Sequence, residues 1–366
     1  MKLLLCTLAT LSLSAASYVS NETSVGASCT INSYNDVNSV VSSCKTITVG
    51  SFEVPAGATL KLALQYGTVL TFNGVITFGY TEWDGPLMWI IGDGVTVQGS
   101  SSHLINGRGS LWWDGYGDHS NKKKPKTMII QATGNSVFKS IKIKDCPHTC
   151  IGITDSHDMT IENWNIDCKD GDSQGGANTD GFDISRSYKI TIKDTVVWNQ
   201  DDCICINQGQ HLMISNMQCT GSHGLSIAVG LYQDYADNTV HNVTFKNSVV
   251  QNSKLGLHIK TIAGNQKGEI SSVTYNNIKL SGISSYGINI QQDYTNDGST
   301  GNPKGNIVIK DLTLTNIYGT LSGTYSTAIY VLCGSGGCSN WHWSGINLQG
   351  ASQPNSCNYA PSGFTC

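Results

Sequence analysis

The sequence predicts an all-β chain folded as a parallel β-helix, a solenoid of stacked coils. Charged residues make up only 13% of the chain, which contains 40 glycines, and many Asn, Ser and Thr residues separate short apolar stretches. Asn, Ser and Gly favour turns, whereas β-branched residues favour strands. One strand pattern also recurs in phase along the chain, as expected of a repeat architecture. A β-sandwich has many short strands too, but it does not explain that recurrence.

The N-terminus predicts a secretory signal peptide at 1–16. A lysine precedes an apolar run, and small residues at 14–17 suit cleavage near Ala16. The run is shorter than the ~20 residues that a membrane span needs. We therefore expect a secreted, extracellular protein with one domain at 17–366, which we expect to be monomeric. The net charge of −4 indicates neither a nucleic-acid nor a membrane partner.

Cysteine usage predicts disulfide bonds. There are thirteen cysteines, and Cys6 is removed with the signal peptide, so an even number enters an oxidising compartment. The segments 333–338 and 357–366 look like short disulfide loops. A zinc site is the competing interpretation, but no Cys/His cluster has ligand spacing. Sequons at Asn21 and Asn242 are compatible with glycosylation.

The recurring strand pattern is five residues long, with apolar second and fourth positions and mostly small or polar third and fifth positions. Such alternation places one face of the strand inside and one outside. The copies are CIGIT, GFDIS, CICIN, GLSIA, GLHIK and GINIQ, and their starts are separated by 31, 22, 21, 32 and 31 residues. Other short strands, such as MTIENWNI and YKITIKDTVV, lie between them. Each coil would bury its inner residues against its neighbours.

The coil spacing brings acidic residues together. Equivalent positions on adjacent coils lie one strand spacing apart, about 4.8 Å. Asp180, Asp202 and His223 each directly precede a copy of the pattern, so they are expected to stack as a column. Asp201 lies one residue earlier, and Lys260 lies on the outward face of a later coil. Adjacent acids in a turn are ordinarily just solvated, but this column indicates a functional cluster.

Four segments resemble the signature motifs of glycoside hydrolase family 28, the polygalacturonases: NTDGFDIS (178–185), NQDDCICIN (199–207), GSHGLSIAVG (221–230) and HIKTI (258–262). The resemblance covers essentially the whole mature chain. It implies a right-handed parallel β-helix. It also implies hydrolysis, with inversion, of α-1,4 links between galacturonic acid units of de-esterified pectin, without a metal or cofactor.

The resemblance also implies roles for individual residues. Asp201 corresponds to the general acid, Asp180 and Asp202 to the pair that activates water, and His223 to a residue that tunes the acid. The implied substrate-binding residues are Asn178, His258, Lys260 and Tyr294. The implied disulfides are Cys29–Cys44, Cys203–Cys219, Cys333–Cys338 and Cys357–Cys366. Four further cysteines have no counterpart and stay unassigned: Cys146, Cys150, Cys168 and Cys205.

The chemistry of the cluster agrees with glycoside hydrolysis, because clustered acids push their pKa values apart and the reaction needs one protonated and one ionised carboxyl. Inversion requires about 6.5–9.5 Å between them and retention about 5 Å. Coil spacing leaves both open, so inversion is expected from the resemblance alone. A polyanionic substrate needs cations, for which the lysine run at 121–126 is a candidate, although it could equally be a solvated loop. Trp112 and Trp113 fit packing beneath a loop better than stacking on sugar.

One position departs from the family pattern. The motif matched by HIK normally begins with arginine, which holds a carboxylate in a bidentate fork and is always charged; His258 does neither. Three interpretations follow: an imidazolium favoured by acidic pH or by neighbouring acids, a preference for partly esterified or substituted chains, or a low-activity galacturonan-binding protein. We expect retained hydrolase activity, because the three Asp residues and His223 are all present.

Other classes fit less well. A pectin lyase needs calcium or an arginine base, and a methylesterase would leave chain length unchanged. A non-enzymatic solenoid would carry regular outward Thr or Asn ladders, whereas the outward positions here are irregular: Asp183, Cys205, Ser226, His258 and Asn289. No long insertion closes a cleft, which favours cleavage within the chain over cleavage from its ends.

Overall fold

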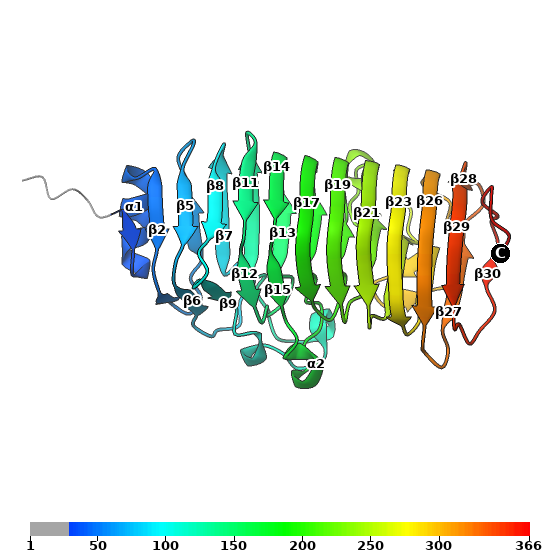
Figure 1. The fold of residues 1–366 in the computed structure, drawn as a ribbon, viewed down its shortest axis with the longest axis horizontal. Coiled ribbons are helices and arrows are strands. Elements are labelled where there is room, and N and C mark those ends of the chain that lie inside the picture. Colours follow the sequence, from blue (N-terminus) through cyan, green and yellow to red (C-terminus); the bar gives the residue numbers. More distant parts are fainter. Residues whose placement is uncertain (1–28) are drawn as a thin grey trace, which may run out of the picture.

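Strands stack in parallel along one long axis in the computed structural model, which describes residues 29–366 (Figure 1). The predicted signal peptide at 1–16 and the sequon at Asn21 lie outside the described residues. The predicted parallel β-helix is confirmed: successive coils hydrogen-bond in register, and the pairings are parallel except for one short antiparallel pair, β24 with β25.

The strands belong to two sheets. The larger sheet contains β1 (Thr30–Ile31), β2 (Thr46–Val49), β3 (Phe52–Val54), β5 (Val69–Phe72), β6 (Val75–Phe78), β8 (Thr96–Gly99), β9 (Leu104–Asn106), β11 (Ser136–Lys139), β12 (Lys142–Lys144), β14 (His157–Glu162), β15 (Asn165–Asp167), β17 (Ser187–Trp198), β19 (Gly209–Thr220), β21 (Thr239–Gln251), β23 (Gly268–Ile283), β26 (Ile307–Leu321), β28 (Cys338–Ser339) and β29 (His342–Gln349). The second sheet contains β4 (Leu60–Ala63), β7 (Met88–Asp93), β10 (Met128–Thr133), β13 (Ile151–Thr154), β16 (Phe182–Ser185), β18 (Ile204–Ile206), β20 (Leu225–Val229), β22 (Leu255–Ile262), β24 (Tyr286–Thr295), β25 (Gly298–Ser299), β27 (Thr327–Leu332) and β30 (Ser356–Cys357).

Helical segments are short. They are α1 (Val37–Ser43), α2 (Gly171–Gln174) and the 3₁₀ turns η1 (Tyr34–Asp36), η2 (Gly109–Leu111), η3 (Gly117–His119) and η4 (Ala236–Asn238). Among the described residues, no helix has the length and apolar character needed to cross a membrane.

The second sheet carries the recurring pattern in the predicted phase. Its apolar second positions pair from coil to coil in the order Ile151, Phe182, Ile204, Leu225, Leu257 and Ile288. All of them are buried. The intervening positions therefore project outward from the same sheet, because side chains alternate along a strand.

The turns of the larger sheet are built by Asn and Asp in the left-handed conformation. Asp194, Asn216, Asn247, Asn277 and Asn316 all have φ between 52° and 56°, a region that Asn and Asp tolerate better than other side chains. Their side chains form a ladder: Asn216 donates to Asp194 over 2.7 Å, and Asn277 and Asn316 each donate to the preceding Asn over 2.9 Å. These turn residues thus also link neighbouring coils.

Both ends of the solenoid core are covered. At the N-terminal end, α1 buries Val37, Val40 and Val41 against the first coils (Figure 1). At the C-terminal end, Trp341 and Trp343 are buried and stack with ring centroids 6.0 Å apart. Both ends of a solenoid need such covers, because an open end exposes apolar surface and unpaired backbone groups.

Five disulfides are present among the described residues. Four are the pairs that the resemblance implies: Cys29–Cys44, Cys203–Cys219, Cys333–Cys338 and Cys357–Cys366. The fifth joins Cys146 to Cys150, two of the cysteines left unassigned by the sequence. The other two unassigned cysteines, Cys168 and Cys205, are buried thiols.

Candidate active site

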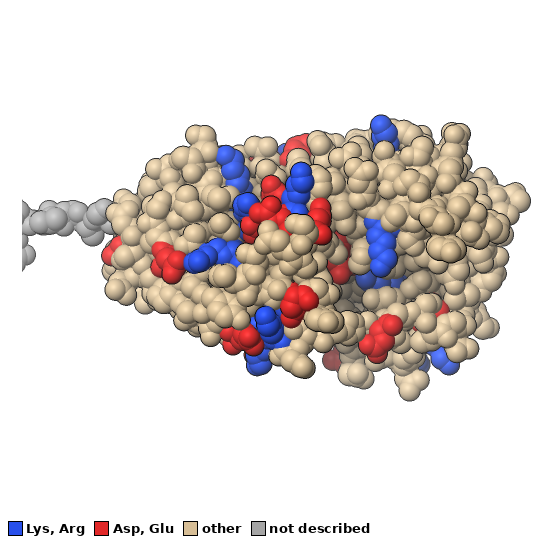
Figure 2. Space-filling view, turned by 90° about the horizontal axis from the view of Figure 1, so that it is seen from below, with Lys and Arg blue, Asp and Glu red and all other residues tan. Residues whose placement is uncertain are grey.

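A groove of about 900 Å³ lies over the outward face of the second sheet. Its floor is formed by outward residues of β16, β18, β20, β22 and β24, and its walls include η3 and the β24–β25 connection. Figure 2 shows a hollow in this face with acidic and basic side chains at its rim. The groove lies where the sequence predicts the functional cluster.

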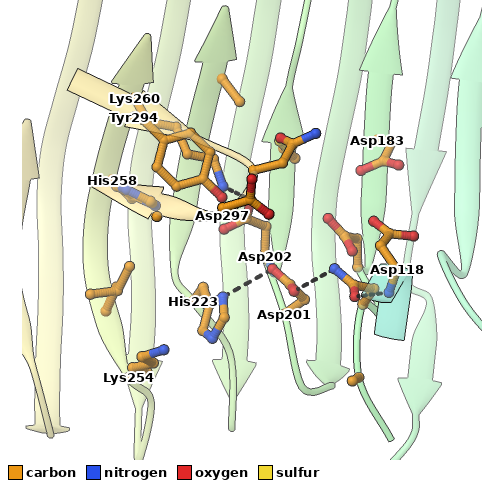
Figure 3. Close-up of a pocket in the computed structure, with 18 of the residues that line it drawn as sticks. Asp118, Asp183, Asp201, Asp202, His223, Lys254, His258, Lys260, Tyr294 and Asp297 are labelled. Atoms are coloured by element: carbon orange, nitrogen blue, oxygen red, sulfur yellow. Dashed lines mark hydrogen bonds and ion pairs between the residues drawn. The ribbon is translucent and has the colours of Figure 1, made fainter. Parts of the chain in front are cut away.

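The predicted column is present. Because Phe182 pairs with Ile204 and Ile204 with Leu225, Asp180, Asp202 and His223 occupy equivalent positions on three successive coils. All three line the groove together with Asp201, and Figure 3 shows Asp201, Asp202 and His223 there. The solenoid thus brings together residues that are up to 43 positions apart in the chain.

Asp201 has hydrogen-bond donors on both carboxylate oxygens. His223 Nδ1 lies 3.0 Å from Oδ1, which also accepts the Asp202 backbone N–H over 2.8 Å. Asn178 Nδ2 donates to Oδ2 over 3.1 Å from a left-handed backbone (φ 51°). Burial pushes the pKa of Asp201 upward, but the bond to His223 and the charge of Lys260 outweigh it, so this pKa lies below its ordinary value. The ionised form is therefore favoured in the free site.

Asp202 and Lys260 form a buried ion pair. Lys260 Nζ lies 3.0 Å from Asp202 Oδ2, with only 10% and 2% of the two side chains exposed. Ser226 Oγ donates to the other carboxylate oxygen over 2.6 Å. Burial alone would lower the pKa of Lys260, but Asp202 raises it well above the ordinary value. The ammonium also lies 4.9 Å from the centroid of the Tyr294 ring, so it is held from two sides.

Asp180 differs electrostatically from its neighbours. Its pKa is raised well above the ordinary carboxyl value, first by burial and then by the charges of Asp183, Asp201 and Asp202. Asp183, in contrast, accepts hydrogen bonds from Lys126 over 3.0 Å and from Thr149 over 3.1 Å. The pKa values within the cluster are therefore pushed apart, upward at Asp180 and downward at Asp201. Hydrolysis of a glycoside needs carboxyl groups whose pKa values are separated in this way.

His258 is neutral in this site. Its side chain lies in the groove floor and the residue is only 5% exposed. Burial, followed by the charge of Lys260, lowers the pKa of His258 to about 3. The interpretation that neighbouring acids hold it as an imidazolium is therefore wrong. Asp202, the acid whose charge acts on His258, is already paired with Lys260, and desolvation outweighs its attraction.

The lysine run does not act as one patch. Lys123 pairs with Asp84 at the surface, Lys124 is buried against Asp114, and only Lys126 lines the groove. Trp112 and Trp113 are buried, and their indole N–H groups donate to backbone carbonyls. As expected, they pack beneath a loop.

Sequence reasoning missed one pair in the groove. His148 Nε2 lies 2.8 Å from Asp118 Oδ1, which lowers the pKa of Asp118. His148 lies two residues before the CIGIT copy, and Thr149 directly before it takes the position that Asp180 has one coil later. The position directly before the strand pattern was therefore the sequence signal that could have pointed to this part of the groove. Asp118 comes from η3, a turn that no repeat predicts.

Two groups in the groove have metal-ligand geometry: Asp180, Asp202 and Cys205, and Asp201, Asp202 and His223. Both groups include Asp202. A cation bound there would have to displace the Lys260 ammonium, so the donor set fits an ion-paired carboxylate better than a metal centre.

Comparisons with known proteins identify the family of the chain. Residues 44–366 match the family described as glycosyl hydrolases family 28. A polygalacturonase of Phaedon cochleariae is 46% identical over 361 residues, covering 97% of this chain and 98% of the relative. Endopolygalacturonase I of Aspergillus niger is 44% identical over 353 residues, covering 96% and 95%. The structure of endopolygalacturonase I from Stereum purpureum, complexed with two galacturonate molecules, superposes with a TM-score of 0.79 at 33% identity, covering 90% and 96% of the two chains.

Proposed function

This chain belongs to family 28 of the glycosyl hydrolases, and on that premise we propose that it hydrolyses α-1,4 bonds between galacturonic acid units of pectin, within the chain and with inversion. The observation that carries the proposal is the Asp180–Asp202–His223 column with Asp201 beside it, in an open groove. Relatives that cover nearly the whole chain are named polygalacturonase or endopolygalacturonase. We propose polygalacturonan as the substrate of a secreted monomer; the five disulfides support an oxidising compartment.

In the proposed mechanism, Asp201 donates a proton to the glycosidic oxygen while a water molecule attacks the anomeric carbon from the opposite face. Asp180 and Asp202 orient that water, and one of them accepts its proton. The contact of Lys260 with Asp202 supports a base role for Asp202, because the ammonium holds and orients this carboxylate in the groove. Each turnover thus uses one water and returns the proton to the site.

The ionised state of Asp201 in the free site opposes an acid role, and we propose that substrate binding reverses it. A substrate carboxylate near His223 competes for the imidazole that stabilises ionised Asp201, and it adds negative charge. Both effects raise the pKa of Asp201. Asp201 then takes up the proton that it donates to the glycosidic oxygen.

The acid assignment is tested with Asp201→Asn and Asp180→Asn, which are close to isosteric. We expect Asp201→Asn to reduce kcat on polygalacturonate by about 10²–10⁴-fold with binding largely kept. An aryl oligogalacturonide, whose leaving group needs no protonation, should restore its activity but not that of Asp180→Asn. Rescue of Asp180→Asn alone would move the acid role to Asp180.

The first measurement is reducing-end release from de-esterified polygalacturonate between pH 4 and 8, with product sizes resolved and the anomer of the first product followed by NMR. Mixed oligomers with an inverted anomer are expected. Release of single sugars only would replace internal cleavage with cleavage from chain ends. No release at any pH, with binding retained, would make the protein a galacturonan binder, the alternative raised by His258 in place of the family arginine.

A further inference from the structure

His258 has an unusual environment for a buried polar side chain. It lies between Ser226 and Asn289 in the outward column of the second sheet, and its edge faces the Tyr294 ring at 6.3 Å. Among the described residues, neither ring nitrogen has a hydrogen-bond partner, and the side-chain oxygen of Asn289 on the next coil has none either. Buried polar atoms are nearly always paired in folded proteins. These three atoms therefore lack partners in the same part of the groove.

The groups around His258 supply no cation of their own. The Lys260 ammonium is paired with Asp202. The groove residues on the following coils include no cation: Ser285, Tyr286, Asn289, Gln291 and Tyr330 are neutral, and Asp297 is an acid. Lys254 makes no ion pair among the described residues, but Figure 3 places it below His223, apart from His258, Lys260 and Tyr294. It therefore suits the carboxylate of a neighbouring sugar unit.

These contacts favour an uncharged ligand group. A neutral imidazole offers one N–H donor and one acceptor nitrogen, and the Asn289 carbonyl offers a further acceptor. These atoms are fully buried in the free site, so the ring and the amide have to turn toward the groove before an ester carbonyl can accept the imidazole N–H and sugar hydroxyls can donate to the acceptors. A carboxylate placed here would lose its hydration without gaining a free cation as partner, which disfavours its binding. The burial that lowers the pKa of His258 to about 3 keeps the ring neutral throughout the range in which the enzyme would be assayed.

We propose that His258 and Asn289 form a subsite for a galacturonate unit whose carboxyl group is methyl-esterified, so that the enzyme cleaves partly esterified pectin beside an esterified unit. The inference rests on the proposed hydrolysis of galacturonan. It makes His258 a specificity residue rather than a defect in the site.

The test compares wild type, His258→Arg and His258→Gln on unesterified polygalacturonate and on pectin of intermediate methyl-esterification. The glutamine variant is the matched control, because it stays neutral and keeps a donor and an acceptor. We expect His258→Arg to lower the ratio of kcat/KM on esterified over unesterified substrate at least tenfold, by gaining on the unesterified chain. The ratio for His258→Gln should stay within about threefold of wild type.

Mass spectrometry of the products of the wild-type enzyme is an independent test that needs no variant. Methyl esters on the unit beside the new chain end are expected. Products whose units at the cut are always unesterified, or an unchanged ratio in His258→Arg, would overturn the subsite.

Binding to Asp201→Asn, measured by calorimetry with esterified and unesterified oligogalacturonides, separates the two proposals. If the variant binds the esterified ligand more tightly but the wild type shows no turnover, the hydrolase proposal is contradicted and the subsite proposal is supported. If the wild type cleaves unesterified chains but the variant does not bind esterified ones, the hydrolase proposal is supported and the subsite proposal is contradicted.

Discussion

At the scale of single residues, the site depends on which charges have partners. Asp202 and Lys260 are 58 positions apart, yet they form a pair with almost no exposed surface. Such a pair contributes little net stability compared with an apolar pair, because both ions lose their hydration. Removing one partner leaves the other charge buried alone. The pair therefore makes the state of Asp202 sensitive to Lys260.

We predict that Lys260→Met abolishes activity and lowers the free energy of unfolding by about 3–5 kcal/mol, because ionised Asp202 is left unpaired. The double variant Asp202→Asn/Lys260→Met should recover most of that stability but no activity. Denaturant unfolding and the reducing-end assay measure both effects.

Lys123→Met is the matched control for this experiment. Its ion pair with Asp84 is exposed, with 61% and 80% of the side chains accessible, so its loss should cost less than about 1 kcal/mol. Equal stability of Lys260→Met and Lys123→Met would show that the buried pair does not hold Asp202 in its ionised state.

At the scale of elements, the coil spacing leaves no room between some backbones. A Cβ added at Gly181, just before β16, would lie 2.4 Å from the backbone oxygen of Cys203, whereas one at Gly152 in β13 would meet nothing closer than 3.6 Å. Gly181 also follows Asp180 directly. A shift between β16 and β18 there would move Asp180 relative to Asp202.

We predict that Gly181→Ala destabilises the protein by about 1–3 kcal/mol, as overpacking typically does, and reduces kcat more than KM. Gly152→Ala, one coil earlier, should change either quantity little. Thermal unfolding and steady-state kinetics on polygalacturonate provide the measurements. Unimpaired turnover by Gly181→Ala would mean that the spacing of Asp180 and Asp202 tolerates such a shift.

At the scale of the whole molecule, the solenoid depends on its ends. Each coil contacts mainly its neighbours, so the first coil has an apolar inner face, which α1 helps to cover. Val40 in α1 is 6% exposed and belongs to the core, while Asn38 in the same helix is exposed.

Val40→Asp should therefore lower Tm and promote self-association, since it places a charge against the end of the core at a cost of a few kcal/mol. Asn38→Asp adds the same charge on the outer face and should change stability by less than about 0.5 kcal/mol. Thermal unfolding and light scattering test this pair. Matching behaviour of the two variants would contradict the capping role of α1.

The sequence by itself determined the solenoid, the register of its coils and the column of Asp180, Asp202 and His223. Each of these follows from periodicity, because a strand pattern repeated in phase must align equivalent positions on neighbouring coils. Asn and Asp at the turns follow from local backbone preference in the same way.

Only the tertiary structure decided the charge states and partners within the site. It paired Lys260 with Asp202 and Cys146 with Cys150, and it buried His258 as a neutral ring. The sequence pattern could not decide these features, because desolvation and ion pairing depend on side chains that different coils and loops bring together. Periodicity states which residues share a face, whereas burial depends on everything packed against that face.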